Sequence, residues 1–227
     1  MTTNRPTALV TGANRGIGRA IALDLGRTHH VLVGGRDAEA VQEVVGLLPD
    51  AEAWVADLAS GEFPPIPARL DVIVHSAGVE AGSSVENTDT ATWQRVFEVN
   101  VFAVAALTRH ALPALRLASG LVVSVNSGSG FTSSPGGGTY AASKFALRAM
   151  TDALREEERP NGVRVSSIHP GRTDTGMQRQ LVASEGDDYD TRFYLSPDDV
   201  ASAVRMVVDL PPAGTVEMVS VRPSRKR

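Results

Sequence analysis

The chain contains no cysteine, which excludes disulfide bonds, thiol chemistry and cysteine-based metal sites. Long hydrophobic runs are also missing. The longest one, from Val101 to Leu107, is far shorter than the roughly 20 apolar residues that cross a membrane. The first residues lead straight into a strand-like run and lack the apolar core of a signal peptide. We therefore expect a cytoplasmic protein with no membrane partner.

Positive charge is not in excess, since the net charge is −4 at pH 7 and the pI is about 5.7. This balance argues against a nucleic acid or an anionic membrane surface as a partner. The basic end from Arg222 to Arg227 is then expected to be a solvated tail. The histidines, at positions 29, 30, 75, 110 and 169, have no metal-ligand spacing, so we predict no metal site.

The composition is that of an ordinary globular protein, with 42% hydrophobic and 21% charged residues and a mean hydropathy of −0.06. A chain of 227 residues can bury roughly 70–75% of the surface that it exposes when unfolded. No internal repeat and no linker long enough to separate two domains is present. We predict one domain that covers residues 1–227.

Short apolar runs alternate with helical patterns along the chain. The predicted strands are 7–10, 30–33, 51–55, 71–74, 120–125, 163–168 and 216–221. Helical patterns follow the first strand to about residue 27, cover 92–117 and 140–159, and begin again at Ser196-Pro197. Strands that alternate with helices predict an α/β fold with a Rossmann-like, doubly wound, mostly parallel sheet of seven strands and helices on both faces.

A glycine turn joins the first strand to the first helix. It reads Thr11-Gly12-Ala13-Asn14-Arg15-Gly16-Ile17-Gly18. A strand, a glycine turn and a helix in this order direct free backbone N–H groups and a helix dipole at a phosphate. The spacing is G-x-x-x-G-x-G and not G-x-G-x-x-G, and tight turns also use glycine for their own geometry. Alone, this turn does not separate the two interpretations.

Two arginines indicate which dinucleotide would bind. Arg36 follows the second strand, where an NAD site usually carries an acid for the ribose 2′-OH, and Arg15 lies inside the glycine turn. Two cations at this place suit a 2′-phosphate, and Arg36 could also stack on adenine. The alternatives are two surface arginines without a partner, or Asp37 holding a 2′-OH in an NAD-linked enzyme. We favour NADP(H) over NAD(H), because Asp37 lies one residue too late.

Tyr140 and Lys144 lie four residues apart in a predicted helix, so they share one face. A fixed cation at about 4 Å and an effective dielectric of about 20 would favour the phenolate by about 4 kcal/mol, roughly three pKa units. Desolvation opposes this effect, so three units is an upper limit. We expect a lowered Tyr140 pKa and a tyrosine ready for acid–base catalysis. Taken alone, Tyr-x-x-x-Lys is more often a partly buried tyrosine beside a lysine from the helix surface.

Other polar residues lie where strands and helices would bring them near this pair. Ser127 follows the strand 120–125, at the edge where open α/β sheets bind ligands. Asn100 is polar among apolar neighbours in the predicted helix 92–117; it could bond a backbone carbonyl and bend the helix, and hold a water beside Lys144. Asp57 could contact adenine or cap the next turn. His75 is expected to be a packed histidine.

The stretch 176–197 shows little periodicity before Ser196, so we predict a substrate lid loop there. Its residues Met177, Leu181, Tyr189, Phe193 and Tyr194 could line an apolar pocket or merely pack the lid down. Arg179 and Arg192 could meet an acidic substrate, but we favour ordinary surface arginines.

The chain as a whole resembles the short-chain dehydrogenase/reductase family, of the ordinary non-extended type. The matching motifs, in order, are Thr11-Gly12-x-x-x-Gly16-x-Gly18, Asp57, Ala77-Gly78, Asn100, Ser127, Tyr140-x-x-x-Lys144, and Pro170-Gly171 with Thr175. The resemblance implies a strand order of 3-2-1-4-5-6-7. It also implies subunits packed through 92–117 and 140–159, hence a homodimer or homotetramer.

The resemblance also assigns roles. Tyr140 would supply the proton, Ser127 would polarise the substrate carbonyl, Lys144 would bind the nicotinamide ribose, and Asn100 would hold a water in a proton relay. The residues expected to bind the cofactor are Gly12, Asn14, Arg15, Gly16, Ile17, Gly18, Arg36, Asp57, Leu58, Ala77, Gly78, Tyr140, Lys144, Pro170, Gly171, Thr173 and Thr175. Basic residues at positions like those of Arg15 and Arg36 resemble the NADP-preferring members.

The chain departs from the family at His75-Ser76, where Asn-Asn is frequent, and at Asn126, where serine is common. It is also short for the family, which implies a fairly open substrate site. We predict an NADPH-dependent oxidoreductase that reduces a small ketone or aldehyde to an alcohol, or runs the reverse reaction. The alternatives are an NAD-linked alcohol dehydrogenase and a non-catalytic NADP-binding redox sensor.

Overall fold

Seven parallel strands form one sheet in the order β3-β2-β1-β4-β5-β6-β7. They are β1 (Thr7–Val10), β2 (His30–Gly35), β3 (Ala51–Val55), β4 (Val72–His75), β5 (Leu121–Val125), β6 (Arg164–Pro170) and β7 (Met218–Val221). The computed structural model describes residues 5–81, 83–186 and 188–225. The predicted fold class and strand order are confirmed, and β7 begins two residues later than the sequence pattern predicts.

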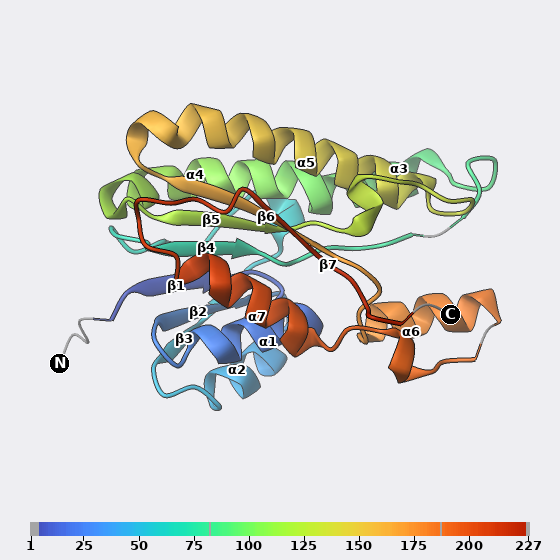
Figure 1. Ribbon diagram of the computed structural model, residues 1–227, viewed down its shortest axis with the longest axis horizontal. Helices are drawn as coiled ribbons and strands as arrows, with labels where there is room; N and C mark the ends of the chain where they lie inside the picture. Colours follow the sequence, from blue (N-terminus) through green and yellow to red (C-terminus); the bar gives the residue numbers. More distant parts are fainter. Residues whose placement is uncertain (1–4, 82, 187, 226–227) are drawn as a thin grey trace.

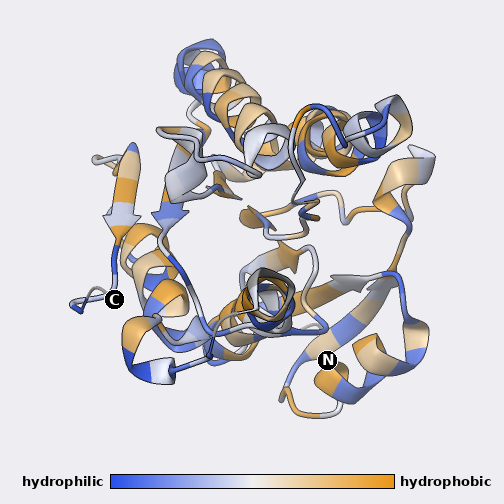
Figure 2. Cartoon of the chain, turned by 90° about the vertical axis from the view of Figure 1, so that its right-hand side faces the viewer, coloured by the Kyte–Doolittle hydropathy of each residue, from blue (hydrophilic) through white to orange (hydrophobic). Residues whose placement is uncertain are grey.

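Helices cover both faces of this sheet (Figures 1 and 2). They are α1 (Gly16–Leu25), α2 (Ala38–Val45), α3 (Thr90–Phe97), α4 (Ala103–Ala118), α5 (Gly138–Glu158), α6 (Gly176–Glu185) and α7 (Pro197–Val208). In Figure 1, α3, α4 and α5 lie above the sheet and α1, α2 and α7 below it. The carboxyl ends of the strands point to the right, where α6 also lies.

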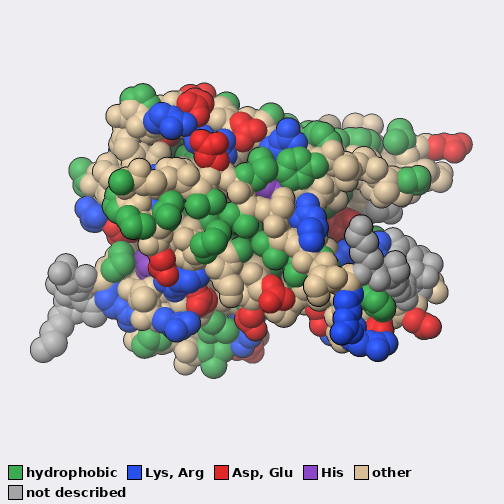
Figure 3. All heavy atoms as spheres, viewed as in Figure 1, with side chains coloured by type: hydrophobic (Ala, Val, Ile, Leu, Met, Phe, Trp, Pro, Cys, Tyr) green, Lys and Arg blue, Asp and Glu red, His purple; other side chains and the backbone are tan. Residues whose placement is uncertain are grey.

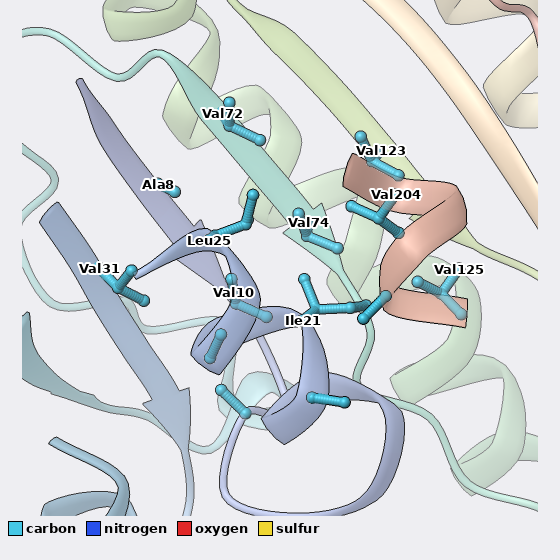
Figure 4. Packing of buried hydrophobic residues seen from close by; sticks show 14 of the residues in the cluster. Ala8, Val10, Ile21, Leu25, Val31, Val72, Val74, Val123, Val125 and Val204 are labelled. Carbon is cyan, nitrogen blue, oxygen red and sulfur yellow. The ribbon is translucent and has the colours of Figure 1, made fainter. Parts of the chain in front are cut away.

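Alternation along the strands builds two apolar cores. Leu9, Ile73 and Val122 face the cluster that contains residues of α4, and Val10 and Val74 face the cluster with residues of α1, α2 and α7 (Figure 4). Because helices cover both faces, the central strands are buried on both sides and read as continuous apolar runs.

Most helices begin at a residue whose side chain caps them. Asp37 accepts hydrogen bonds from two N–H groups of α2, Asp89 caps α3 and Thr175 caps α6. At α7, Ser196 and Asp199 form a reciprocal capping box with Pro197 in the first turn. The predicted start of this last helix is therefore confirmed. The first helix, α1, differs and is described with the site.

The predicted lid loop is wrong in its first half, because residues Gly176–Glu185 form α6. Thr175 accepts a hydrogen bond from the Gln178 N–H and so begins the helix, and Val182 packs into the protein with 1% exposure. The sequence pattern indicated a loop because the apolar residues of this stretch show only weak helical periodicity. A short 3₁₀ turn, η5 (Thr191–Phe193), follows, and residue 187 lies outside the described residues.

The predicted helix 92–117 is also interrupted. A π turn, η2 (Glu98–Phe102), separates α3 from α4 and contains Asn100. Thr90–Ala118 is, among the described residues, the one helical stretch long and apolar enough to cross a membrane. Core helices of globular proteins meet the same test, and here 39% of its apolar window is buried inside the protein.

On the face drawn in Figure 3, basic and acidic side chains are mixed. Lys226 and Arg227, at the end of the predicted basic tail, lie outside the described residues.

Candidate active site

The glycine turn between β1 and α1 is too tightly packed for side chains. A Cβ atom added to Gly18 would lie 2.2 Å from the Gly12 carbonyl oxygen, closer than any real contact. Gly12 has a φ of +64° and presses against Ala77, whose Cα would be 2.9 Å from an added Cβ. The Ala13 N–H donates to the Gly34 carbonyl at 2.7 Å, which joins the turn to the end of β2. The turn therefore brings bare backbone to the sheet edge.

Helix α1 begins without a side-chain cap. Arg15 occupies the N-cap position and makes no capping hydrogen bond, and the first turn holds no acidic residue. An added Cβ on Gly16 would lie 3.4 Å from the Thr175 methyl group, so the start of α1 faces the segment after β6. An uncapped helix N-terminus beside glycines is a site for an anion such as a pyrophosphate. Bare glycines and a helix start without a side-chain cap thus fit a dinucleotide.

The Thr11 hydroxyl holds the end of β4 against this turn. It accepts hydrogen bonds from the Ser76 and Ala77 N–H groups, both at 3.1 Å, and donates to the Val74 carbonyl at 3.4 Å. Ala77 and Gly78 therefore lie beside the glycine turn, as the sequence predicts. Gly78 also borders the catalytic candidates, since an added Cβ would lie 3.9 Å from the Lys144 Nζ.

The two arginines predicted for the 2′-phosphate are both exposed. No hydrogen bond or ion pair involves either guanidinium among the described residues, so both charges remain available for a ligand. Asp37 is committed elsewhere, because its carboxylate accepts from the Glu39 and Ala40 N–H groups at 3.1 and 3.2 Å as the cap of α2. This capping role weakens the alternative in which Asp37 binds a ribose 2′-OH.

The remaining cofactor candidates lie around the ends of β3 and β6. Asp57 caps a short turn, η1 (Leu58–Ser60), through the Ala59 N–H, so the capping interpretation of this residue is confirmed and the adenine contact stays a prediction. Pro170 ends β6, the Gly171 N–H donates to the Val221 carbonyl at 2.7 Å, and Thr173 donates to the Gly171 carbonyl. These residues follow the strand edge that the glycine turn also reaches.

Asn100 is 1% exposed, and its side chain makes three hydrogen bonds. Its Oδ1 accepts from the Val79 N–H at 2.9 Å, and its Nδ2 donates to the Val79 carbonyl at 2.9 Å and to the Ser143 Oγ at 3.0 Å. The predicted carbonyl bond and helix irregularity are confirmed, because Asn100 lies in the π turn. It connects the segment after β4 to α5, and the relay water stays a prediction.

Tyr140 and Lys144 share one face of α5. The Lys144 Nζ lies 5.5 Å from the centre of the Tyr140 ring and donates to the Val125 carbonyl at 3.2 Å. Lys144 is 4% exposed, and its burial lowers its pKa to about 8, against an opposing effect of Glu80. The ammonium is therefore held at the edge of the sheet by the main chain.

The expected fall in the Tyr140 pKa is wrong for the protein without ligands. Burial raises this pKa to about 12, the Ser127 side chain as hydrogen-bond partner lowers it, and the charge of Glu80 raises it further. The sequence argument assumed an ammonium about 4 Å from the hydroxyl, but Nζ lies 5.5 Å from the centre of the ring and bonds to the Val125 carbonyl. Desolvation of the phenolate then exceeds the attraction of the cation.

Ser127 caps a short 3₁₀ turn, η3 (Gly128–Gly130), directly after β5. Its Oγ accepts from the Ser129 N–H at 3.1 Å, which leaves its single proton for donation. The Ser127 side chain lies close enough to Tyr140 to lower the pKa of the phenol, so the structure brings Ser127 and Tyr140 together. Two donors, one a phenol, therefore converge where a carbonyl oxygen could bind.

Three residues beside this group were missed. Glu80 acts electrostatically on both Tyr140 and Lys144, and its only sequence signal is that it follows Ala77-Gly78. Asn126 donates from Nδ2 to the Lys144 carbonyl at 3.1 Å, whereas the sequence marked it only as a departure from the family. His169 contacts the Ser127 carbonyl at 3.0 Å. His75 is buried and bonded to Thr108 Oγ1, as predicted for a packed histidine.

The lid arginines pair with acids on the surface, which confirms the plainer interpretation. Arg179 forms two hydrogen bonds with the Asp174 carboxylate at 2.9 and 3.0 Å, and Arg192 lies 2.7 Å from Asp190. Tyr189 donates to Asp174 as well, and its ring stacks on Tyr194 with the centres 4.5 Å apart. These contacts hold the two tyrosines together beside Asp174, which comes just before the 176–197 segment.

Comparisons with known proteins agree with this geometry. Residues 6–186 match the short chain dehydrogenase family. An uncharacterized oxidoreductase of Staphylococcus saprophyticus is 31% identical over 231 residues, covering 95% of this chain and 96% of its own. The X-ray structure of an alcohol dehydrogenase from the archaeon Thermococcus sibiricus, complexed with 5-hydroxy-NADP, is similar with a TM-score of 0.88, 26% identity and 98% of both chains covered.

A second solved structure has a closer sequence. It is a putative NAD(P) dependent gluconate 5-dehydrogenase from Beutenbergia cavernae with bound NADP, 32% identical, with a TM-score of 0.85 over 96% of this chain and 95% of its own. The family match covers most of the sequence and the fold similarity nearly all of it. The chain belongs to the short-chain dehydrogenase family of oxidoreductases.

Proposed function

We propose that this chain is an NADPH-dependent carbonyl reductase, or the corresponding alcohol dehydrogenase, for a small ketone or aldehyde. The observation that carries the proposal is the convergence of Ser127 and Tyr140, close enough for Ser127 to lower the Tyr140 pKa, beside the buried Lys144, whose Nζ lies 5.5 Å from the centre of the Tyr140 ring. All three lie at the carboxyl edge of the sheet, where open α/β sheets bind their ligands. The uncapped start of α1 lies at the same edge.

Bound NADPH would supply the hydride, and the chain's own residues would position the substrate and move the proton. Ser127 donates a hydrogen bond to the carbonyl oxygen, and Tyr140 donates its proton to that oxygen as negative charge develops there. Lys144 binds the nicotinamide ribose and stabilises the phenolate that proton transfer leaves. Asn100 fixes the geometry of α5 through Ser143 and holds the water of the proposed relay.

NADP(H) is the better fit of the two dinucleotides. Arg15 and Arg36 are exposed and unpartnered among the described residues, and both similar solved structures carry an NADP ligand. Asp37, the residue that an NAD-linked enzyme would need, is already bonded to the start of α2. The remaining proposed contacts are Gly12, Asn14, Gly16, Ile17 and Gly18 of the glycine turn, and Asp57, Leu58, Ala77, Gly78, Pro170, Gly171, Thr173 and Thr175.

A redox sensor without catalysis is the second candidate. A sensor needs only the residues that bind the cofactor, whereas here the residues proposed for the reaction are also complete. Burial of Lys144 among them costs free energy, and a sensor would gain nothing from that burial.

We also propose that the chain is one domain, that 176–197 closes over a substrate, and that a homodimer or homotetramer forms. Phe102 and Phe145, 54% and 43% exposed, support the last point. The cytoplasmic location stays a prediction.

The test has two stages. The purified protein is first titrated with NADPH and with NADH, followed by nicotinamide fluorescence, and we expect NADPH to bind at least tenfold more tightly. A panel of ketones and aldehydes is then offered with NADPH, and oxidation of the cofactor is followed. Equal binding of both cofactors would favour the NAD-linked alternative. The sensor would be favoured if NADPH bound tightly but no ketone or aldehyde of the panel was reduced and none of the corresponding alcohols was oxidised.

A further inference from the structure

One buried titratable residue near the site has no part in the proposed reaction. His169 is 0% exposed and lies at the end of β6. Side chains alternate along a strand, so His169 and Ser167 face the same side as Val165, which belongs to the apolar cluster under α4. This is also the side of the sheet on which α5 carries Tyr140 and Lys144.

Both ring nitrogens of His169 are hydrogen-bonded. Nδ1 lies 3.0 Å from the Ser127 carbonyl oxygen, and Nε2 lies 2.7 Å from the Ser167 Oγ. A carbonyl oxygen can only accept, so Nδ1 carries the proton and donates it, and Nε2 accepts from the Ser167 hydroxyl. Burial and the nearby charges of Arg148, Arg222 and Lys144 lower the pKa of His169, so the ring stays neutral in this tautomer.

The Ser127 carbonyl needs this donor because the sheet ends beside it. The last bond between β5 and β6 runs from the Asn126 N–H to the Ile168 carbonyl at 2.7 Å. The Ser127 carbonyl then accepts from the Gly130 N–H at 3.0 Å inside η3, and the His169 ring fills its second acceptor position. Two bonds at fixed angles determine the orientation of this peptide and therefore the direction of the Ser127 Cα–Cβ bond.

The ring itself cannot swing away. The Phe131 ring packs against it with centres 4.4 Å apart, and the Arg148 guanidinium covers the other part of Phe131 at 4.7 Å. Arg222 donates to the His169 carbonyl, and its guanidinium would lie 3.3 Å from a Cβ added to Gly128. The histidine is thus held between Arg222, which follows β7, and the turn η3 that it orients.

We propose that His169 is a positioning residue that aims the Ser127 hydroxyl at the substrate carbonyl by holding the Ser127 main chain. This inference rests on the proposed function, in which Ser127 polarises that carbonyl. A hydroxyl displaced by about 1 Å from its productive place can lower a rate by about 10²-fold. The effect of losing the His169 ring should therefore appear in kcat, while the NADPH Kd should change little, because the ring bonds to Ser127 and Ser167 and the main chain that leads to Pro170 and Gly171 is kept.

A matched pair of amides tests the geometry. In His169→Asn the amide nitrogen can take the place of Nδ1 and still donate to the Ser127 carbonyl. In His169→Gln the amide reaches the place of Nε2 and bonds to Ser167 instead. We expect His169→Gln to lower kcat about 30- to 100-fold with KM and the NADPH Kd within about twofold, and His169→Asn to stay within about fivefold of the unchanged protein. Equal losses of kcat in both would overturn the proposal.

A double-mutant cycle with Ser127→Ala separates positioning from a general loss of packing. If His169 acts through the Ser127 hydroxyl, His169→Gln should cause no further loss of kcat in the Ser127→Ala background. Full additivity of the two losses would overturn the inference while leaving the proposed function intact. Undiminished kcat in Ser127→Ala alone would instead contradict the proposed function. His75→Gln, a change at a buried histidine that bonds to Thr108, is the control and should lower Tm without lowering kcat.

Discussion

The two ends of the proposed cofactor cleft are built in opposite ways. At the phosphate end, Arg15 and Arg36 are exposed and unpartnered among the described residues, and the groups that would meet a ligand are bare backbone N–H donors. At the reaction end, Lys144 is buried, its ammonium is bonded to the main chain, and the Asn100 side chain makes three hydrogen bonds. The phosphate end thus keeps its charged side chains exposed to solvent, whereas hydrogen bonds within the protein already hold the side chains of the reaction end.

The two ends also differ in how their charged groups are solvated. The exposed guanidinium groups of the phosphate end lie in water, and they attract an anion over a distance set by salt. Burial at the reaction end instead raises the Tyr140 pKa to about 12 and lowers the Lys144 pKa to about 8. The protein therefore buries Tyr140 and Lys144, against the free energy of desolvation, where proton transfer is proposed. It leaves charged side chains hydrated where only binding is proposed.

The largest effect is expected from Tyr140→Phe, which removes the proposed acid and keeps the ring. Removing a general acid lowers rates by about 10²- to 10⁴-fold, so we expect kcat below about 1% of the original. The NADPH Kd should stay nearly unchanged, because the phosphate end is untouched. Steady-state kinetics with a substrate from the carbonyl panel, beside fluorescence titration, measures both. Retention of more than a few per cent of kcat would remove Tyr140 as the acid.

A smaller effect is expected at the other end from Arg36→Leu. A charge-assisted hydrogen bond contributes about 1.5–3 kcal/mol, so the NADPH Kd should rise about 10- to 100-fold and the NADH Kd should hold within about twofold. The matched control is Asp37→Ala, next to it in the chain. We expect that change to destabilise α2 by about 1 kcal/mol without altering the ratio of the two Kd values. An equal loss of both cofactors in Arg36→Leu would refute the 2′-phosphate contact.

The smallest effect is expected from Glu80→Gln at the reaction end. The negative charge of Glu80 raises the pKa of Tyr140 and of Lys144, so its removal must lower both. Reduction needs protonated Tyr140 and charged Lys144, so the alkaline limb of its pH–rate profile should move to lower pH. Oxidation needs the phenolate, so its acid limb should move in the same direction. Glu86→Gln, at an exposed position further along the chain, is the control, and an identical shift there would exclude a local effect of Glu80.

Much of the phosphate end could be predicted from the sequence because its elements are local. The turn Gly12 to Gly18 joins one strand to the helix that follows it, and Arg15 and Arg36 stand at fixed offsets from strand ends. The cap at Ser196 and the strand spacing were readable for the same reason. The lid was not, since α6 is held by the distant packing of Val182 and by Thr175, with little periodicity of its own.

The reaction end depended on distances that no local pattern contains. Four-residue spacing placed Tyr140 and Lys144 on one face, but it could not show that Nζ would bond to Val125 and leave the phenol to be governed by burial. Nor could it show that Glu80 or His169 would lie there.

The layered sheet, the glycine turn and the candidate polar residues could be predicted from the sequence, because periodicity and turn chemistry act between near neighbours. The pKa values of those polar residues and the direction in which their side chains point follow only from the folded protein. Those properties depend on burial and on hydrogen bonds between segments far apart in the chain, such as the bond from His169 to the Ser127 carbonyl.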